Sequence, residues 1–483
     1  MLDKDLSRRD FLKTLGGTAV AATALSVGCT NPNSASTEGF ALGEVPTDKM
    51  SYRENAHGQK VSLLGYGCMR LPVVEGKDGN DEGSAIDQER VNELTDYAIA
   101  HGVNLFDTAP RYCKGRSEHA MGIALSRHPR DEYFISTKMS NMGADCWSRA
   151  ASIAMFENSL KELQVDYLDY LLLHCMGLPG KDAQGNPVSP MDMFKVRFLD
   201  NGMLNYLMEQ RAKGRIRNLG FSYHGDVKVF DHLLSMHDQV HWDHVLIQHN
   251  YIDWNHAAQD SGDANSEYLY SELAKRDIPV FVMEPLLGGQ LATLPQFAVD
   301  LLKQRQPQRS IASWAFRFAG QQPRILTVLS GMTYMEHLQD NLRTFSPHEP
   351  LTEDELALLQ DIAARYVEFP LVPCTGCQYC MPCPYGLDIP GIFAHYNKCV
   401  NSGDLLGNPM DDAEGDAVSD ADVRAYRRAR RAYLVGYDRA VDPRRQADHC
   451  IQCGRCLSEC PQGIDIPNQM ARIESFTNSL KSL

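Results

Sequence analysis

The sequence has little positive charge. Its 47 Lys and Arg residues are outnumbered by 62 Asp and Glu residues, which gives the 483-residue chain a formal net charge of −15. This balance argues against a nucleic-acid partner, because contacts to phosphates require a basic surface. The content of 43% hydrophobic and 23% charged residues is that of a soluble globular protein, and a chain of this length is expected to contain two domains.

Long hydrophobic runs are also missing. The apolar stretch at residues 14–28 contains several Gly, Ala and Thr residues and is shorter than the roughly 20 residues that span a bilayer, so no transmembrane segment is predicted. Ser7-Arg8-Arg9-Asp10-Phe11-Leu12-Lys13 precedes it and resembles a bacterial twin-arginine export signal. We therefore predict a signal peptide over residues 1–29 and export to the periplasm or cell envelope. The alternative is an amphipathic helix with an incidental Arg pair, in a cytoplasmic protein.

Two further expectations concern the chain just after this signal. Cys29 follows the small residue Gly28 and is a candidate lipid anchor, although Ser26 stands where such anchors usually have Leu. Residues 30–54 are predicted to form a flexible tether, because the stretch from residue 30 to 50 is rich in Ser, Thr, Asn and Gly.

No Gly-x-Gly-x-x-Gly motif follows any predicted strand, so the main signature of an open dinucleotide-binding sheet is missing. Short β-rich runs instead alternate with amphipathic helices, a pattern typical of parallel βαβ units. Eight such units favour an α/β fold with a closed (β/α)8 barrel over residues 55–346. A linker helix within 347–370 and a small α-helical domain over 371–483 should follow. The expected strands are 61–65, 103–106, 133–136, 167–173, 217–221, 245–248, 280–283 and 325–329.

Eight of the 14 cysteines form two runs near the C-terminus. The second run has the Cys-x2-Cys-x2-Cys-x3-Cys-Pro spacing of bacterial ferredoxins, and the first is one residue shorter in its last gap. In two-cluster ferredoxins the fourth cysteine of a run ligates the other cluster, so a different last gap is tolerated. We predict two [4Fe–4S] clusters, one on Cys374, Cys377, Cys380 and Cys460 and the other on Cys383, Cys450, Cys453 and Cys456.

Structural zinc is the alternative for these cysteines, although zinc sites usually use two separated pairs. Gly376 and Gly454 lie between ligands, where the backbone is expected to approach a cluster closely. A disulfide framework is not favoured, because its cysteines would be spread through a small fold. The remaining cysteines are interpreted as ordinary small residues; they are Cys68, Cys113, Cys146, Cys175 and Cys399.

Polar residues end three consecutive predicted strands. Asp107 follows Phe106, Lys138 follows Ser136-Thr137, and His174 follows Leu171-Leu172-Leu173. Their spacing of about one βα unit places all three at the C-terminal ends of neighbouring strands, the face on which barrel enzymes carry their active sites. Together with Tyr112, five residues after Asp107, they resemble the catalytic tetrad of the aldo/keto reductase family.

The resemblance implies a role for each member of this tetrad. Tyr112 would protonate the alkoxide that forms when hydride reaches a carbonyl carbon. A Tyr with an ordinary pKa near 10 is a poor acid unless a cation stabilises its phenolate, and Lys138 would supply that cation. Asp107 would hold Lys138 in place, and His174 would orient the carbonyl by a hydrogen bond. Cys113 and Cys175 adjoin Tyr112 and His174, so a redox role for these two cysteines stays open.

The resemblance also implies a bound nicotinamide nucleotide, NADP or NAD. His337 replaces the Arg that typically helps to clasp a 2′-phosphate, and the corresponding Lys is also replaced, so NADP preference is in doubt and NAD is plausible. The residues that match the family's nucleotide site are Ser222 and Gln248 at the carboxamide, Met283 at the ring, Leu286 and Gly288 in the loop over the pyrophosphate, and Ser330, Gly331 and Asn341 at the adenosine end.

Together with the resemblance, these features predict an oxidoreductase in which nicotinamide-dependent hydride transfer to a carbonyl or from an alcohol is coupled to electron transfer through two clusters, with a redox protein as a possible partner. The alternative is an electron-transfer or redox-sensing protein whose barrel binds nucleotide without turnover. Substrate selection is expected in the loops 77–87 and 177–189. Arginines on the helix after residue 422 are either a solvated face or a docking surface for an acidic partner. Because free nucleotide should be scarce outside the cytoplasm, we expect the nucleotide to be exported tightly bound and recycled through the clusters.

Overall fold

The computed structural model describes residues 44–76, 78–79, 84–257, 264–405 and 419–481. Residues 44–483 form one compact unit. The predicted signal peptide, Cys29 and most of the predicted tether lie outside the described residues. So do Lys77 and residues 80–83, which fall in the first of the two loops expected to select substrate.

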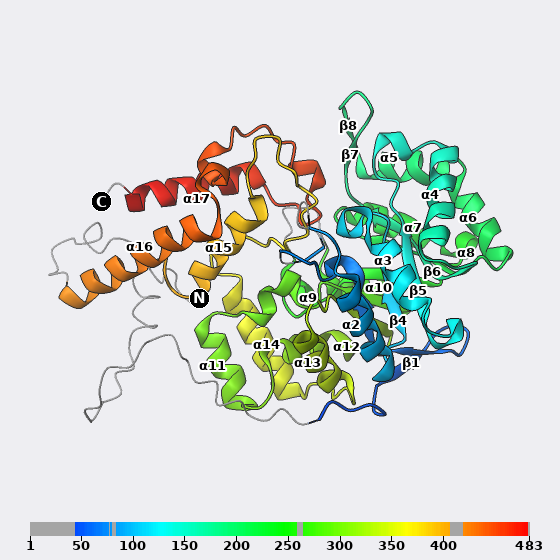
Figure 1. The fold of residues 1–483 in the computed structure, drawn as a ribbon, viewed down its shortest axis with the longest axis horizontal. Helices are drawn as coiled ribbons and strands as arrows, with labels where there is room; N and C mark the ends of the chain where they lie inside the picture. Colours follow the sequence, from blue (N-terminus) through cyan, green and yellow to red (C-terminus); the bar gives the residue numbers. More distant parts are fainter. Residues whose placement is uncertain (1–43, 77, 80–83, 258–263, 406–418, 482–483) are drawn as a thin grey trace, which may run out of the picture. The chain divides into compact units, whose positions relative to one another are not determined.

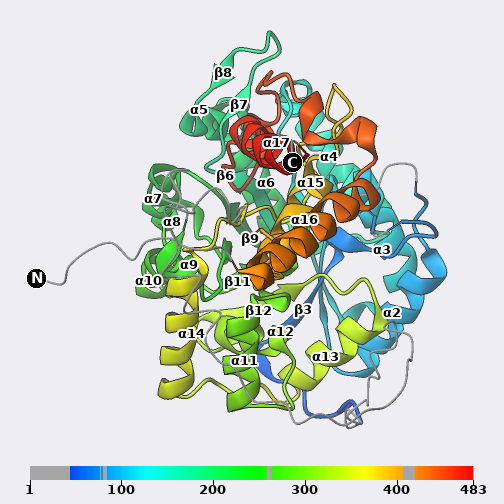
Figure 2. The same cartoon turned by 90° about the vertical axis from the view of Figure 1, so that its left-hand side faces the viewer.

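Eight parallel strands form a closed barrel in the order β10-β11-β12-β3-β4-β5-β6-β9 (Figure 1, Figure 2). This confirms the predicted (β/α)8 fold, and all eight strands overlap the predicted ranges. Their bounds are β3 (Leu64–Gly67), β4 (Leu105–Asp107), β5 (Phe134–Met139), β6 (Leu168–Met176), β9 (Ile216–Tyr223), β10 (His244–Gln248), β11 (Val280–Met283) and β12 (Ile325–Ser330).

The strands are buried on both faces, which explains their nearly continuous apolar sequences. Leu105, Tyr170, Leu246 and Phe281 pack together inside the barrel. The opposite faces pack against helices that surround the strands (Figure 2). These helices are α2 (Gln88–Ala100), α3 (Ser117–Leu125), α4 (Arg149–Glu162), α6 (Met203–Ala212), α7 (Val227–Ser235), α10 (Ser266–Lys275), α11 (Gln296–Arg305), α12 (Ile311–Gly320) and α13 (Met335–Phe345), with the shorter α5 (Pro190–Phe194), α8 (His237–Val240) and α9 (Asp253–His256) between them.

Two expectations at the start of the barrel were wrong. Residues 61–65 do not form one strand: β2 (Lys60–Ser62) pairs antiparallel with β1 (Tyr52–Glu54), and the barrel strand begins only at Leu64. Residues 44–54 also do not belong to a tether. Val45 and Met50 are buried in the barrel core, and their burial fixes this stretch to the folded unit.

The expected linker helix is α14 (Glu353–Tyr366). It begins with a capping box between Thr352 and Glu355, which satisfies free backbone amides in its first turn. Glu355 also forms a buried salt bridge with Arg317 of α12, with Nη2 and Oε2 2.8 Å apart. This contact ties the linker to the barrel.

The C-terminal domain has its own core. Its helices are α15 (Ile389–Asn401), α16 (Asp420–Ala440) and α17 (Ile466–Lys481), and they bury Phe393, Tyr433 and Met470 between them. The first cysteine run lies before α15, and the second lies between α16 and α17. No helix in the described part of the chain is long and apolar enough to cross a membrane.

Candidate active site and cysteine-rich domain

The barrel brings Asp107 and Lys138 into direct contact. Asp107 ends β4 and Lys138 lies in the neighbouring strand β5. Lys138 Nζ is 2.6 Å from Asp107 Oδ2 and donates a second hydrogen bond of 2.8 Å to the Thr108 carbonyl oxygen. Ser136 Oγ donates to Asp107 Oδ1 at 2.7 Å. Both charged side chains are almost fully buried, so this ion pair is held in one geometry.

Tyr112 and His174 lie next to this pair. Lys138 Nζ lies 4.6 Å from the centre of the Tyr112 ring, and the Tyr112 and His174 ring centres are 6.1 Å apart. Burial, and then the charge of Asp107, raise the pKa of Tyr112 well above its ordinary value. Tyr112 is therefore protonated at neutral pH, as a proton donor must be, but its pKa is raised rather than lowered as the expected role of Lys138 implied. The structure thus brings all four predicted tetrad residues together.

His174 is held neutral. Burial, followed by the charges of Lys138 and Arg197, lowers the pKa of His174 well below its ordinary value. Ser140 Oγ is 2.6 Å from His174 Nδ1 and fixes the ring orientation. Arg197 donates to the His174 carbonyl oxygen at 2.6 Å. Sequence reasoning missed Ser140 and Arg197, because neither belongs to a motif or ends a predicted strand.

Several residues expected at a nucleotide lie at the C-terminal ends of strands, and Asn341 lies in α13. Ser222 Oγ, near the end of β9, accepts a hydrogen bond of 2.8 Å from the Cys175 backbone N–H. Asn341 donates to Ser330 Oγ at 2.9 Å, and both side chains are buried. Met283 is half-buried at the end of β11, whereas Gly331 is exposed. Their role at a nucleotide stays a prediction.

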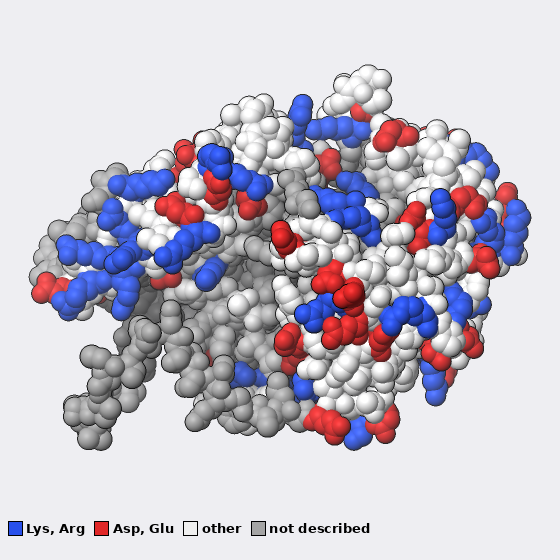
Figure 3. Space-filling model, viewed as in Figure 1, with Lys and Arg blue, Asp and Glu red and all other residues white. Residues whose placement is uncertain are grey.

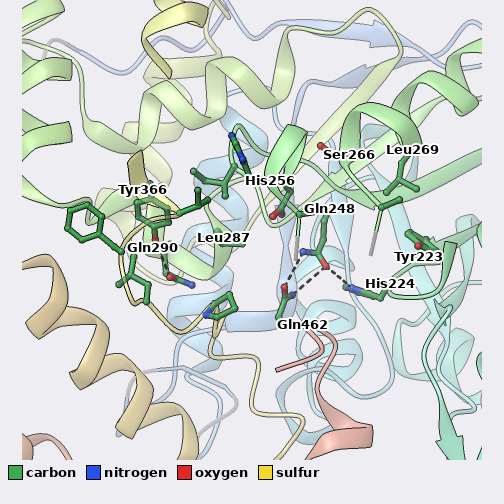
Figure 4. A pocket seen from close by; sticks show the side chains of 18 residues that line it. Tyr223, His224, Gln248, His256, Ser266, Leu269, Leu287, Gln290, Tyr366 and Gln462 are labelled. Carbon is green, nitrogen blue, oxygen red and sulfur yellow. Dashed lines mark hydrogen bonds between the residues drawn. The ribbon is translucent and has the colours of Figure 1, made fainter. Parts of the chain in front are cut away.

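Gln248, at the end of β10, contacts the C-terminal domain. Its side-chain amide exchanges two hydrogen bonds with the amide of Gln462, of 3.2 and 3.4 Å, and its oxygen is 2.9 Å from His224 Nδ1 (Figure 4). The pair lines a cavity of about 250 Å³, together with Leu287, Gln290 and Tyr366. No tetrad side chain lines this cavity.

The loop after β11 also contacts the C-terminal domain. Gly288 lies so close to Thr375 that a Cβ on Gly288 would stand 2.3 Å from the Thr375 Cα. Gln290 donates to the Cys374 carbonyl oxygen at 3.2 Å, and Arg70 donates to the Thr375 carbonyl oxygen at 2.5 Å. The first cysteine run therefore begins against the loop that contains Leu286 and Gly288.

The eight clustered cysteines form two adjoining groups. Cys374, Cys377 and Cys380 interact electrostatically with Cys460, and Cys456 interacts with Cys383, Cys450 and Cys453. Cys380 also interacts with Cys456, so the groups adjoin. This grouping matches the two expected ligand sets, although their role as ligands stays a prediction.

The two runs share a backbone conformation. Gly376 and Gln378 have positive φ angles of 65° and 62°, and Gln452 and Gly454 have φ angles of 58° and 68°. Counted from the first cysteine of each run, these are the same two positions, with Gly and Gln exchanged. The shorter last gap of the first run therefore leaves the loop around its first three cysteines unchanged.

A sequence model of the aldo/keto reductase family matches residues 64–364. The chain belongs to the aldo/keto reductase family. A model of the 4Fe-4S dicluster domain matches residues 373–465, so this aldo/keto reductase combines the barrel with an iron–sulfur domain, called the cluster domain below.

Relatives of this aldo/keto reductase include Protein tas of Escherichia coli, 27% identical over 367 residues, which cover 66% of this chain and 99% of that protein. D-arabinose 1-dehydrogenase of Saccharomyces cerevisiae is 34% identical over 151 residues, 29% of this chain and 38% of that enzyme. The structure of an aldo-keto reductase from Klebsiella pneumoniae in complex with NADPH aligns at 20% identity with a TM-score of 0.49, over 65% of this chain and 95% of that chain. The match spans only 38% of the yeast enzyme's length, so it does not assign that enzyme's substrate to this chain.

The cysteine groups fit iron–sulfur clusters. Burial and neighbouring thiols raise the pKa of Cys374 and Cys456 to about 11, so positive charge is required to hold them as thiolates. Iron would supply that charge. Among the residues that the structure describes, no three His, Cys, Asp or Glu side chains are placed to hold one metal ion.

In this arrangement, two residues expected to contact a nicotinamide nucleotide contact the cluster domain instead. Gln248 is paired with Gln462, and Gly288 lies against Thr375. Two of the expected nucleotide positions are thus occupied by the cluster domain.

Proposed function

We propose that this aldo/keto reductase reduces a carbonyl or oxidises an alcohol at its tetrad, and that electrons pass through two [4Fe–4S] clusters. The observation that carries the proposal is the position of Tyr379, between Cys377 and Cys380. Arg111, next to Tyr112, lies 5.4 Å from the centre of the Tyr379 ring, and Tyr379 is close enough to Tyr112 to raise its pKa. The first cysteine run and the tetrad therefore adjoin.

The tetrad supports acid–base chemistry at one oxygen atom. A carbonyl becomes an alcohol when it gains two electrons and two protons. Tyr112 is the proton donor in this proposal, because it is protonated and half-buried beside His174. A neutral His174, held by Ser140, orients the carbonyl oxygen, and the ammonium group of Lys138 stabilises the charge left on Tyr112.

The cluster domain supplies the electron path. In the proposed sets, Cys374, Cys377, Cys380 and Cys460 hold one cluster and Cys383, Cys450, Cys453 and Cys456 hold the other; each bound cluster would carry one electron at a time. Hydride transfer from NAD or NADP, the family's usual chemistry, would require the cluster domain to leave Gly288 and Gln248.

An acidic redox protein is the proposed electron partner. Helix α16 exposes Arg424, Arg427, Arg428, Arg431 and Arg439, and Figure 3 shows these blue side chains gathered where Figure 1 places α16. A basic face on a chain of net charge −15 selects partners by charge and steers their approach.

Export by the twin-arginine route is also proposed, from Arg8 and Arg9. Replacing both with Lys (Arg8→Lys, Arg9→Lys) should leave the protein in the cytoplasmic fraction, while an Asp3→Asn variant should still be exported. Equal distribution of both variants would refute the signal. If Cys29 carries a lipid anchor, only detergent should release the protein from membranes. Cys29→Ser should remove this requirement for detergent.

The test of the proposed function is anaerobic purification followed by assays of iron, sulfide and released nucleotide on one sample. About eight iron and eight sulfide per chain are expected from two clusters. Turnover of a panel of carbonyls and alcohols is then measured with artificial electron donors and acceptors and with added nucleotide. Turnover that Tyr112→Phe abolishes supports an enzyme. No turnover under any of these conditions would favour the non-catalytic redox protein.

A further inference from the structure

Gln462 presents to the barrel the same chemical group that a nicotinamide ring would present. The resemblance to aldo/keto reductases assigns Gln248 to the carboxamide of the nicotinamide. In this structure, Gln248 instead forms a reciprocal amide pair with the side-chain carboxamide of Gln462, with distances of 3.2 and 3.4 Å (Figure 4). Gln462 follows Cys460 by two residues, so the group that occupies the carboxamide position belongs to the proposed ligand segment of a cluster.

Residues 373–376 occupy the next part of the same groove. Thr375 contacts Gly288 in the loop expected over the pyrophosphate, where no side chain could be accommodated on residue 288. Arg70 fixes the segment by donating to the Thr375 carbonyl oxygen at 2.5 Å, and its side chain also lies within 3.5 Å of the Cβ positions of Gly331 and Gly376. Arg70 itself is held by Asp78 at 3.1 Å.

Resting on the function proposed above, we infer that the cluster domain takes the place of the nucleotide. Gln462 and residues 373–376 fill the nicotinamide and pyrophosphate positions, and the tetrad exchanges electrons with the adjoining cluster, held by Cys374, Cys377, Cys380 and Cys460, rather than with a bound nicotinamide.

This inference restricts the substrate class. Clusters deliver single electrons, whereas a simple aldehyde or ketone is reduced by hydride, because its one-electron adduct is too unstable. The substrate is therefore a conjugated carbonyl that accepts electrons one at a time, such as a quinone. Forming a hydroquinone from one quinone would take two electrons, which the clusters held by these cysteines would supply one at a time, and two protons. Tyr112 would give one proton to the oxygen beside His174 and regain it from solvent, and solvent would give the other. Two molecules of an external one-electron donor protein would supply the two electrons.

The test uses the full-length holoprotein under anaerobic conditions. Binding of NADH and NADPH is followed by the fluorescence of the reduced nicotinamide, and cluster reduction by the visible absorbance of the clusters. The inference predicts no saturable nucleotide binding and no cluster bleaching by either nucleotide. It also predicts that chemically reduced protein, freed of excess reductant, is reoxidised by a quinone probe with formation of hydroquinone, and that Tyr112→Phe slows this step by about 100-fold or more.

Variants at the contact test whether these residues fill the nucleotide groove. Gln462→Ala combined with Arg70→Ala should give saturable nucleotide binding that the wild-type holoprotein lacks, while Gln296→Ala, on the exposed face of α11, should not. Saturable binding of nucleotide to the wild-type holoprotein, or bleaching of its clusters by NADH or NADPH, would overturn the inference. If neither nucleotide nor reduced clusters convert any probe, the proposed enzymatic function fails, which is a different outcome from turnover that requires nucleotide.

Discussion

The buried pair of Asp107 and Lys138 gives a prediction whose size can be worked out from the structure. Asp107 accepts hydrogen bonds from Lys138 and Ser136, and Lys138 also donates to the Thr108 carbonyl oxygen. In Asp107→Asn, the ammonium group of Lys138 would face an uncharged amide instead of a carboxylate. In Lys138→Met, the Asp107 carboxylate would keep only the hydrogen bond from Ser136. Removing one partner of a buried ion pair costs about 3–5 kcal/mol. Each single variant should therefore be destabilised by that amount.

The double variant should be destabilised much less than the sum. With both charges removed, no uncompensated ion remains in the barrel, and the side-chain amide introduced by Asp107→Asn could donate to the Thr108 carbonyl oxygen that now accepts from Lys138. We expect the two effects to fall short of additivity by about 2 kcal/mol or more.

Urea unfolding followed by tryptophan fluorescence measures these changes in the barrel alone, because the four Trp residues all lie within residues 147–314. With an m-value of about 3 kcal/mol/M, each single variant should lower the urea midpoint by roughly 1–1.7 M. Additive effects, or single-variant losses below about 1 kcal/mol, would show that the pair is hydrated rather than buried and would refute its positioning role.

Three further variants give distinct readouts. Tyr112→Phe should lower turnover by about 10²–10⁴-fold with unchanged iron content; a smaller loss would remove Tyr112 as the proton donor. Burial raises the pKa of Glu118 from 4.5 to about 7, so the folded state retains a proton that the unfolded chain has lost, and stability falls as pH rises through this window. Glu118→Gln should flatten the pH dependence of the urea midpoint between pH 4.5 and about 7, and an unchanged slope would contradict this cause. Cys383→Ser should lower iron from about eight to about four per chain, whereas the buried Cys399→Ser should retain about eight; equal iron in both would reject the proposed ligand sets.

Much of the barrel could be predicted from the sequence because its signals are local. Each strand is a short apolar run between turn residues, and Asp107, Lys138 and His174 are placed by the strand that each one ends. The same reasoning placed residues 61–65 in one strand, whereas residues 60–62 belong to a separate hairpin strand. The apolar run continues from the hairpin into the barrel strand, so its composition does not mark the boundary. The predicted tether was extended too far for a similar reason, since Val45 and Met50 are single apolar residues in a polar stretch.

The contacts between barrel and cluster domain could not be predicted. Gln248 and Gln462 are 214 residues apart, and Arg70 and Thr375 are 305 apart. Such pairs have no periodicity. The sequence marks Gln248 as a strand-end residue, but nothing around Gln462 marks it as the partner of Gln248. The spacing of the cysteines did predict that the two runs lie close together, because the ferredoxin pattern specifies an exchange between them.

That exchange has a consequence for how the chain matures. On the proposed ligand sets, each cluster takes three cysteines from one loop and a fourth from the other, so neither can be completed while the two loops are apart. Insertion of iron would then act as two cross-links that close the long segment containing α15 and α16, and it would contribute directly to the free energy of folding of this domain. The backbone around Thr375 and Gln462 would become fixed in the same event. A chain without iron would therefore also lack ordered contacts between these two residues and the barrel.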